Sequence, residues 1–153
     1  MSRTPVAVAL GSNLGDREAH LREALDALGT LLDDLLASSI HATAPVGVAP
    51  QPEFLNMAAV GGTALAPGEL LDRLLAIEAR AGRTRPHPGA PRTLDLDLIL
   101  YGDVALNAPG LTVPHPRFRE RRFVLAPLAE VAGDWRDPVT GLRVKELLSR
   151  LAG

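Results

Sequence analysis

Two aspartates separated by a single residue are the part of this sequence best suited to chemistry. The segment Leu94-Asp95-Leu96-Asp97-Leu98 alternates apolar and acidic residues. On a β-strand this alternation puts both carboxylates on one face, with Cα atoms about 6.5 to 7 Å apart. Magnesium in nucleotide sites takes one or two carboxylates and completes its shell with phosphate oxygens and water. The pentapeptide alone is more typical of a solvated sheet face, so its surroundings decide.

The surroundings of this strand are rich in cations, which precede it as Arg83, Arg85 and Arg92 and follow it as His115, Arg117, Arg119, Arg121 and Arg122. Arginine presents a planar fork that matches phosphate oxygens, and a triphosphate with its metal needs carboxylates and such forks together. For any one of these residues, a solvated surface arginine is an equally good interpretation. Arg92 is the first candidate because it lies next to the strand.

Other common catalytic arrangements are missing from the sequence. The glycines of Gly11-Ser12-Asn13-Leu14-Gly15 suggest a phosphate loop, but a Walker loop ends in lysine and Asp16 stands there instead. We interpret this segment as a tight turn into a helix. The chain has no cysteine, which excludes disulfides and thiolate chemistry. The histidines His20 and His41 are expected to be structural or exposed.

The hydrophobic pattern predicts four strands and two helices before position 102. The strands are expected at 6–10, 38–43, 54–65 and 94–101, and the helices from Asp16 and over 67–82. The order strand, helix, strand, strand, helix, strand predicts an α+β, ferredoxin-like βαββαβ core with an antiparallel sheet and both helices on one face. The C-terminal extension, with an amphipathic helix around Val144 and Leu148, should extend the sheet or cover its open face.

The composition limits the class of protein. The 153 residues are 46% hydrophobic, which suits one core, so we expect a single domain over 1–153. A net charge of -2 and 3% aromatic residues give no basic surface for a nucleic-acid partner. The sequence has no signal-peptide pattern and no apolar run of about 20 residues, so no membrane association is expected. We expect a cytoplasmic monomer.

Several motifs together carry a family resemblance. They are Gly11-Ser12-Asn13, Thr43-Ala44-Pro45-Val46-Gly47, Phe54-Leu55-Asn56, Pro91-Arg92-Thr93-Leu94-Asp95-Leu96-Asp97, and Val113-Pro114-His115-Pro116 with Arg121 and Phe123. In this order and spacing the chain resembles the 6-hydroxymethyl-7,8-dihydropterin pyrophosphokinase family of folate biosynthesis, over positions 6 to about 128. The resemblance implies that ATP donates its β,γ-diphosphate to the pterin hydroxymethyl group and leaves as AMP.

The resemblance also implies roles for individual residues. Asp95 and Asp97 would ligate two magnesium ions. Arg83, Arg92 and Asp97 would be catalytic, and ATP would contact Glu78, Arg83, Arg85, Arg92, Leu98, His115 and Arg121. The pterin would lie between Phe54 and Phe123, with Asn56 at its polar edge and further contacts from Thr43, Pro45 and Val46. A flat heterocycle does need two ring faces and an amide at its edge, which fits these residue types.

Two other classes of protein remain as alternatives. A noncatalytic ferredoxin-like module could bind a small ligand without turning over ATP. An RNA-binding sheet of similar topology would need exposed aromatic residues on its central strands and a positive surface. Met57, Leu96 and Leu98 give the second alternative little support.

Overall fold

The computed structural model describes residues 3–13, 15–43, 53–81 and 94–151 of the chain. Its elements are, in chain order, β1 (Thr4–Ser12), α1 (Arg17–Leu28), β2 (Asp33–Ala37), β3 (His41–Thr43), β4 (Phe54–Thr63), α2 (Pro67–Arg80), β5 (Asp95–Tyr101), β6 (Leu106–Ala108), β7 (Leu111–Val113), a 3-10 turn (Phe118–Glu120), α3 (Arg122–Ala132) and α4 (Val144–Leu151). None of the helices in these described ranges has the length and apolarity needed to cross a bilayer.

The main sheet has the strand order β2-β4-β1-β5, with β3 also paired to β4, and all of these pairings are antiparallel. This is the order of a ferredoxin-like sheet, in which the first and third core strands lie at the centre. The α+β prediction is therefore confirmed. The strands β6 and β7 pair with each other in a separate two-stranded sheet.

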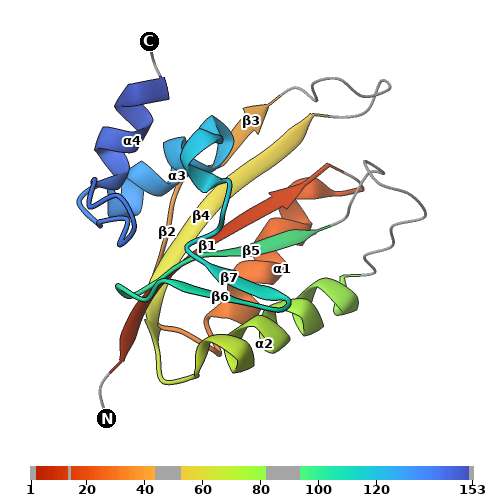
Figure 1. Ribbon diagram of the computed structural model, residues 1–153. Coiled ribbons are helices and arrows are strands. Elements are labelled where there is room, and N and C mark those ends of the chain that lie inside the picture. The colour runs from red at the N-terminus through yellow and green to blue at the C-terminus, as the bar shows by residue number, and fades with distance from the viewer. Residues whose placement is uncertain (1–2, 14, 44–52, 82–93, 152–153) are drawn as a thin grey trace.

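Helices cover both faces of the main sheet, with α1 and α2 on one face and α3 and α4 on the other (Figure 1). Val6, Val8 and Leu10 of β1 belong to the core under α1 and α2. Ala7 faces the second core, together with Leu125 of α3 and other residues of the C-terminal part. The extension thus covers the second face of the sheet, one of the two placements that the sequence allowed.

Local signals at the helix starts explain why the chain folds this way. The side chain of Asp16 caps α1 by accepting the N–H of Ala19 at 3.1 Å, and Gly15 takes a positive φ of 71° just before it. The tight turn is thereby confirmed, but it begins later than predicted, because Gly11 and Ser12 still belong to β1. Helix α2 begins at Pro67, as expected for a proline in the first turn.

Two parts of the fold differ from the sequence-based prediction. The strand expected over 38–43 is two shorter strands, because the hydroxyl of Ser38 accepts the N–H of Ala58 and interrupts the pairing with β4. Most residues of β2 are exposed at the sheet margin, so no apolar alternation marked it. Helix α3 was not predicted, since Pro127 lies inside it.

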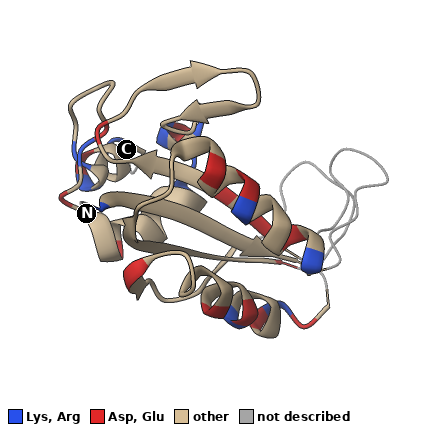
Figure 2. Cartoon of the chain, turned by 90° about the horizontal axis from the view of Figure 1, so that it is seen from below, with Lys and Arg blue, Asp and Glu red and all other residues tan. Residues whose placement is uncertain are grey.

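The described helices carry acidic and basic residues interleaved along their length rather than separated by sign (Figure 2). On α1 the buried residues are Leu21, Ala24 and Leu28, which recur at the helical spacing. The charges therefore lie on the faces turned away from the sheet.

Candidate active site

Strand register aligns four of the site positions in one row across the sheet. Gly11 of β1 pairs with Asn56 of β4 on one side and with Asp95 of β5 on the other, and Asn56 pairs in turn with His41 of β3. Directly paired residues project to the same face of a sheet. Asp95, Asn56 and His41 therefore share the face that α3 covers, and Gly11 leaves the centre of the row without a side chain.

The next row on this face begins with Asp97, which pairs with Ala9 of β1. Leu96 and Leu98, between and after the aspartates, belong to the core on the opposite face. Both aspartates are half-buried. The prediction that the two carboxylates share one face is thus confirmed by register.

Strand β5 bulges immediately after this pair. Ala7 pairs with Leu100 and Val8 with Leu98, which leaves Ile99 as an extra residue. The carbonyl oxygen of Ile99 accepts the N–H of His115 at 2.9 Å. The bulge thus fixes the segment after β7 beside the aspartates.

His115 stands close enough to Asp97 for the two charges to interact. Burial lowers the pKa of His115; Asp97 opposes this shift, while Arg121 and Arg117 reinforce it. Its Nδ1 accepts the N–H of Arg117 at 3.1 Å, so the proton of the neutral ring lies on Nε2. Neutral His115 can therefore donate from Nε2 to a phosphate oxygen without adding a charge.

The cations that follow β5 separate into structural and available groups. Arg119 makes two hydrogen bonds to the fully buried carboxylate of Asp137 and belongs to the scaffold. Arg117 pairs with Glu120 at 2.9 Å on the surface. Arg121 lies over the ring of Phe123, 5.6 Å from its centroid, at the start of α3. Of these three, Arg121 is placed best for a ligand on the α3 face.

Two of the three phenylalanines lie on this face with their rings accessible. Phe54 shares it with Asn56 by strand alternation and is half-buried, and Phe123 of α3 is 42% exposed. Phe118, which the sequence analysis left out of the pterin site, is fully buried in the core. The two rings that the resemblance assigned to the pterin are therefore the two that core packing does not consume.

Asn56 is held in a defined orientation. Its Nδ2 donates to the hydroxyl of Thr43 at 2.7 Å, and its side chain is buried. A Cβ added at Gly11 would lie 3.2 Å from Asn56 Oδ1 and 3.9 Å from the Phe54 ring. The missing side chain at Gly11 therefore gives these two groups their space.

The two remaining nucleotide candidates within the described ranges face the other side of the sheet. Glu78 of α2 is buried and accepts the N–H of Leu96 at 2.7 Å, which holds the backbone between the two aspartates. The side chain of Leu98 is 5% exposed in the core under α1 and α2. Their contacts with ATP stay predictions. Arg83, Arg85, Arg92, Pro45 and Val46 lie outside the described residues.

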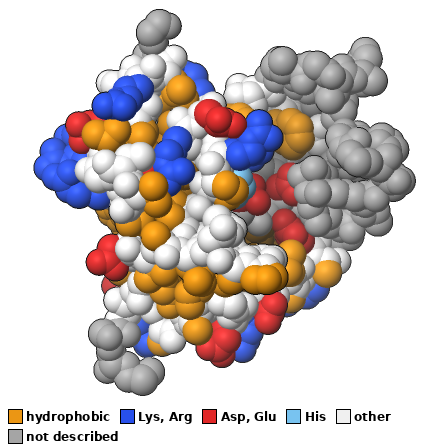
Figure 3. Space-filling model, viewed as in Figure 1, with side chains coloured by type: hydrophobic (Ala, Val, Ile, Leu, Met, Phe, Trp, Pro, Cys, Tyr) orange, Lys and Arg blue, Asp and Glu red, His pale blue; other side chains and the backbone are white. Residues whose placement is uncertain are grey.

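Acidic side chains gather beside basic and histidine side chains in the space-filling view (Figure 3). The described residues contain no group of three or more His, Asp or Glu side chains arranged to hold a metal ion alone. Two carboxylates on one face supply hard oxygen donors, however, and suit an ion that takes its other ligands from phosphate and water. The donor set of Asp95 and Asp97 thus fits magnesium bound together with a nucleotide.

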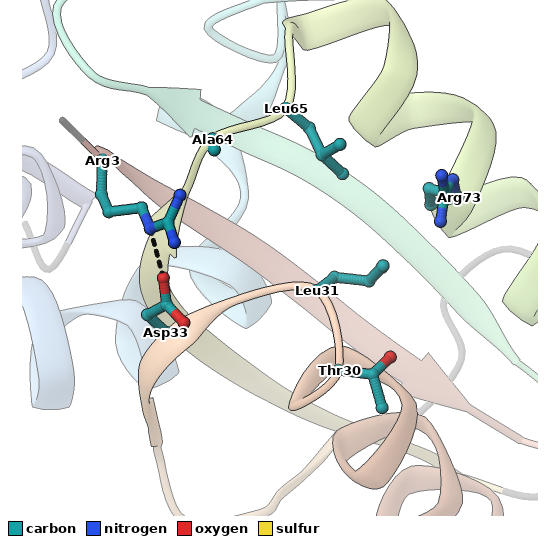
Figure 4. Close-up of a pocket in the computed structure, with 7 residues that line it drawn as sticks. All are labelled: Arg3, Thr30, Leu31, Asp33, Ala64, Leu65 and Arg73. Carbon is teal, nitrogen blue, oxygen red and sulfur yellow. Dashed lines mark ion pairs between the residues drawn. The ribbon is translucent and has the colours of Figure 1, made fainter. Parts of the chain in front are cut away.

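A hollow of about 240 Å³ lies at the opposite end of the sheet (Figure 4). It is lined by Arg3 before β1, Asp33 of β2 and Arg73 of α2, and Arg3 forms an ion pair with Asp33. Thr4 pairs with Thr63 at this end, whereas Gly11 pairs with Asn56 at the other. The hollow is therefore separate from the candidate active site.

Three side chains near the site were not singled out by sequence reasoning. The carboxylate of Glu130 in α3 accepts hydrogen bonds from the N–H and hydroxyl of Ser39 and lies 2.5 Å from Nε2 of His41. His41 was expected to be structural or exposed. The contacts join positions 89 and 91 residues apart, and no local pattern marks them.

A ferredoxin-like sheet with paired carboxylates, phosphate-matched cations and accessible rings on one face defines a class of enzyme that binds a nucleotide and a flat second substrate. The family model of 7,8-dihydro-6-hydroxymethylpterin-pyrophosphokinase (HPPK) matches residues 7–133. The chain belongs to this family, and it is therefore an enzyme of the pyrophosphokinase type.

Relatives with the same name cover most of the chain. The 2-amino-4-hydroxy-6-hydroxymethyldihydropteridine pyrophosphokinase of Pseudomonas aeruginosa is 46% identical over 146 residues, which are 94% of this chain and 90% of the relative. That of Bacillus subtilis is 48% identical over 126 residues, 81% of this chain and 75% of the relative. The mitochondrial folate synthesis bifunctional protein of Arabidopsis thaliana is 44% identical over 131 residues, 84% of this chain and 23% of the relative.

Solved structures share the fold. An HPPK-DHPS in complex with substrates has a TM-score of 0.73 at 12% identity, over 97% of this chain and 43% of that chain. The wild-type Plasmodium falciparum HPPK-DHPS with STZ-DHP has a TM-score of 0.76 at 13% identity, also over 97% and 43%. This chain spans less than half of those solved chains, and at such identities they support the fold alone.

Family membership favours an enzyme over the noncatalytic ligand-binding module. The RNA-binding alternative needs an open sheet face. Among the described elements, α1 and α2 cover one face and α3 and α4 lie over the other (Figure 1). The two alternatives are therefore disfavoured for different reasons, one by relatedness and one by packing.

Proposed function

We propose that this chain transfers the diphosphoryl group of ATP to the hydroxyl of 6-hydroxymethyl-7,8-dihydropterin, which gives AMP and the pterin diphosphate. The observation that carries the proposal is the register row in which Asp95 and Asn56 flank Gly11 on one face. This row puts a candidate metal-phosphate ligand and a candidate pterin ligand on neighbouring strands. A hydroxymethyl group on a pterin bound at Asn56 would then point toward the phosphates.

For the metal, Asp95 and Asp97 hold two magnesium ions together with the phosphates. Bound magnesium bridges phosphate oxygens and neutralises the charge that develops on them during transfer. The support for this assignment is the shared face of the two aspartates and the preference of magnesium for oxygen ligands.

Around the triphosphate, His115 and Arg121 contact phosphate oxygens, together with Arg83, Arg85 and Arg92. The neutral ring of His115 offers its Nε2–H, and the guanidinium groups offer two parallel donors each. Glu78 and Leu98 complete the nucleotide subsite through the part of β5 that they support.

For the pterin, Phe54 and Phe123 stack on the two ring faces, and Asn56 pairs with the polar edge. Thr43 orients the Asn56 amide through their 2.7 Å hydrogen bond, and Pro45 and Val46 complete the subsite. Aromatic stacking of this kind favours offset faces with centroids roughly 4.5 to 7 Å apart.

In the reaction, the pterin hydroxyl oxygen forms a bond to the β-phosphorus, and the bond from that phosphorus to the oxygen bridging to the α-phosphate breaks. AMP leaves with the electron pair of that bond. Asp97 is the candidate acceptor of the hydroxyl proton, and Arg83 and Arg92 stabilise the developing charge. Alignment of hydroxyl and phosphorus supplies most of the remaining rate enhancement.

We further propose that the chain works as a single domain over 1–153, as a monomer in the cytoplasm, without nucleic-acid or membrane partners. The match over 90% of the Pseudomonas aeruginosa relative supports the single domain.

The test is an incubation of the purified protein with ATP, magnesium and 6-hydroxymethyl-7,8-dihydropterin, with nucleotides quantified by chromatography. We expect one AMP per pterin diphosphate, no ADP, and no product without magnesium. A 6-methyl pterin, which lacks the hydroxyl, is the matched control and should bind without reacting. ADP as the product, or no nucleotide turnover, would overturn the proposal.

A further inference from the structure

We infer that Glu130 is a positioning residue for the pterin subsite, because its carboxylate ties the short strand β3 to helix α3. This inference rests on the function proposed above and adds three residues, Ser39, His41 and Glu130, that no motif assigns to the site.

The tie consists of several short contacts from one carboxylate. Glu130 accepts the N–H of Ser39 at 2.8 Å and its hydroxyl at 2.8 Å, and it lies 2.5 Å from Nε2 of His41. The hydrogen bonds from Ser39 and His41 lower the pKa of Glu130, with the Ser39 N–H as the largest cause. At neutral pH the group is therefore an ionised acceptor held by both residues.

Strand β3 has little else to hold it among the described residues. It has three residues and pairs only with β4, at the margin of the sheet. Just before it, the N–H of Ala58 donates to the Ser38 hydroxyl in place of a strand carbonyl. The N–H of Ser39 turns instead to Glu130. The carboxylate thus provides the acceptor that the interrupted sheet does not.

The position of β3 decides how Asn56 is presented to a ligand. The last residue of β3 is Thr43, whose hydroxyl accepts from Asn56 Nδ2 at 2.7 Å, and the first is His41, which pairs with Asn56 in register. An amide that recognises the edge of a heterocycle must keep its oxygen and nitrogen in fixed places. A shift of β3 would therefore reorient Asn56.

The same carboxylate also positions α3 relative to the sheet. Phe123 and Glu130 are seven residues apart on α3, which is about two helical turns, so they project from the same side of the helix. Glu130 holds this side on β3, while Phe123 covers the neighbouring part of the same sheet face. The tie therefore sets the position of Phe123 over the pterin subsite, whose other wall is Phe54.

The test compares Glu130→Ala with Asp134→Ala in the full-length protein. Asp134 lies four residues further along, and its partner is the exposed Lys145 at 2.8 Å, so its variant is the matched control. For Glu130→Ala we expect KM for the pterin to rise roughly tenfold, the low end for lost hydrogen bonds to a charged group. The kcat at saturating pterin and the KM for ATP should stay within about twofold of the wild type. Glu130→Gln, which keeps an acceptor for Ser39, should give an intermediate KM.

A second readout does not depend on turnover. In amide NMR spectra without substrate, Glu130→Ala should shift the Asn56 side-chain resonances and speed hydrogen exchange at His41 and Thr43, and Asp134→Ala should do neither. Equal loss of kcat and of both KM values, or unchanged Asn56 resonances in Glu130→Ala, would overturn the inference. If the wild type makes no AMP, the proposed function fails instead, and the spectra still decide whether Glu130 positions Asn56.

Discussion

The backbone N–H of His115 donates to the carbonyl oxygen of Ile99 at 2.9 Å. Ile99 is the extra residue of the β5 bulge, two positions after Asp97. An irregularity in the strand therefore brings the segment after β7 to the aspartates, where His115 and Asp97 interact electrostatically. Bulges are often found next to active sites because they redirect a chain or a side chain, and this one does so.

Asp95→Asn and Leu96→Ala should have opposite effects, because the two residues face opposite sides of β5. Asp95→Asn should reduce kcat at least about a hundredfold by removing a candidate metal ligand, with the melting temperature close to that of the wild type. Leu96→Ala should cost about 2 to 5 kcal/mol of unfolding free energy and keep measurable activity at low temperature. Activity loss in Asp95→Asn only in step with unfolding would contradict the assignment.

Gly11→Ala should weaken pterin binding more than it weakens folding. The added Cβ would lie 3.2 Å from Asn56 Oδ1, so the amide must move by a few tenths of an ångström. Isothermal titration with 6-hydroxymethylpterin should show several-fold weaker binding, and ATP binding should be unchanged. An affinity equal to that of the wild type would mean that Asn56 does not read the pterin.

Phe123→Ala should abolish tight pterin binding at little cost in stability, since Phe123 is 42% exposed. The matched control is Phe118→Ala, whose ring is fully buried and whose loss should cost about 3 to 5 kcal/mol of unfolding free energy. Pterin affinity and denaturant midpoints measured for both variants would separate the two roles. Equal destabilisation by both would show that Phe123 is a packing residue.

Asp137→Ala should destabilise the fold by about 3 kcal/mol, because it removes the partner of Arg119 from a buried pair. Arg117→Ala breaks an exposed pair with Glu120 and should change stability by less than about 1 kcal/mol. Urea unfolding of both variants at pH 7 checks this contrast. Similar losses in the two would contradict it.

The Asp137 effect should also depend on pH in a defined direction. Burial acts to raise the pKa of Asp137, but hydrogen bonds from Arg119, Thr140 and Val139 outweigh it and lower the pKa. A lowered folded pKa gives stability that is complete above the unfolded value of about 3.9 and is lost as pH falls through the folded value. The gap between wild type and Asp137→Ala should therefore be constant from about pH 5 to 7 and narrow below about pH 4. A gap that widens in acid would reverse the assignment.

Local patterns in the sequence were sufficient for the central strands and their faces. The alternation around Asp95 and Asp97 and the spacing of Phe54 and Asn56 predicted which side chains share a face, because strand geometry has a period of two residues. Helix α1 was predicted from Asp16 and its apolar spacing for the same reason, and Asp16 is its cap.

Features set by distant contacts were beyond reach. The row that puts Gly11 between Asn56 and Asp95 depends on the register of three strands, and nothing in Gly11-Ser12-Asn13 specifies that register. The contact of Glu130 with His41 spans 89 residues. Helix α3 did carry a local signal in Val124, Leu125, Leu128 and Ala132, but Pro127 argued against a helix and was accommodated inside it.

The most direct measurement of the central claim is the fate of each phosphorus atom of ATP. Reactions run separately with ATP labelled at the α, β or γ position should leave the α label in AMP and carry both the β and γ labels into the pterin product. This distribution requires attack at the β-phosphorus, as proposed for a hydroxyl held beside Asp95 and Asp97. Transfer of the γ label alone, with α and β labels together in ADP, would contradict the account.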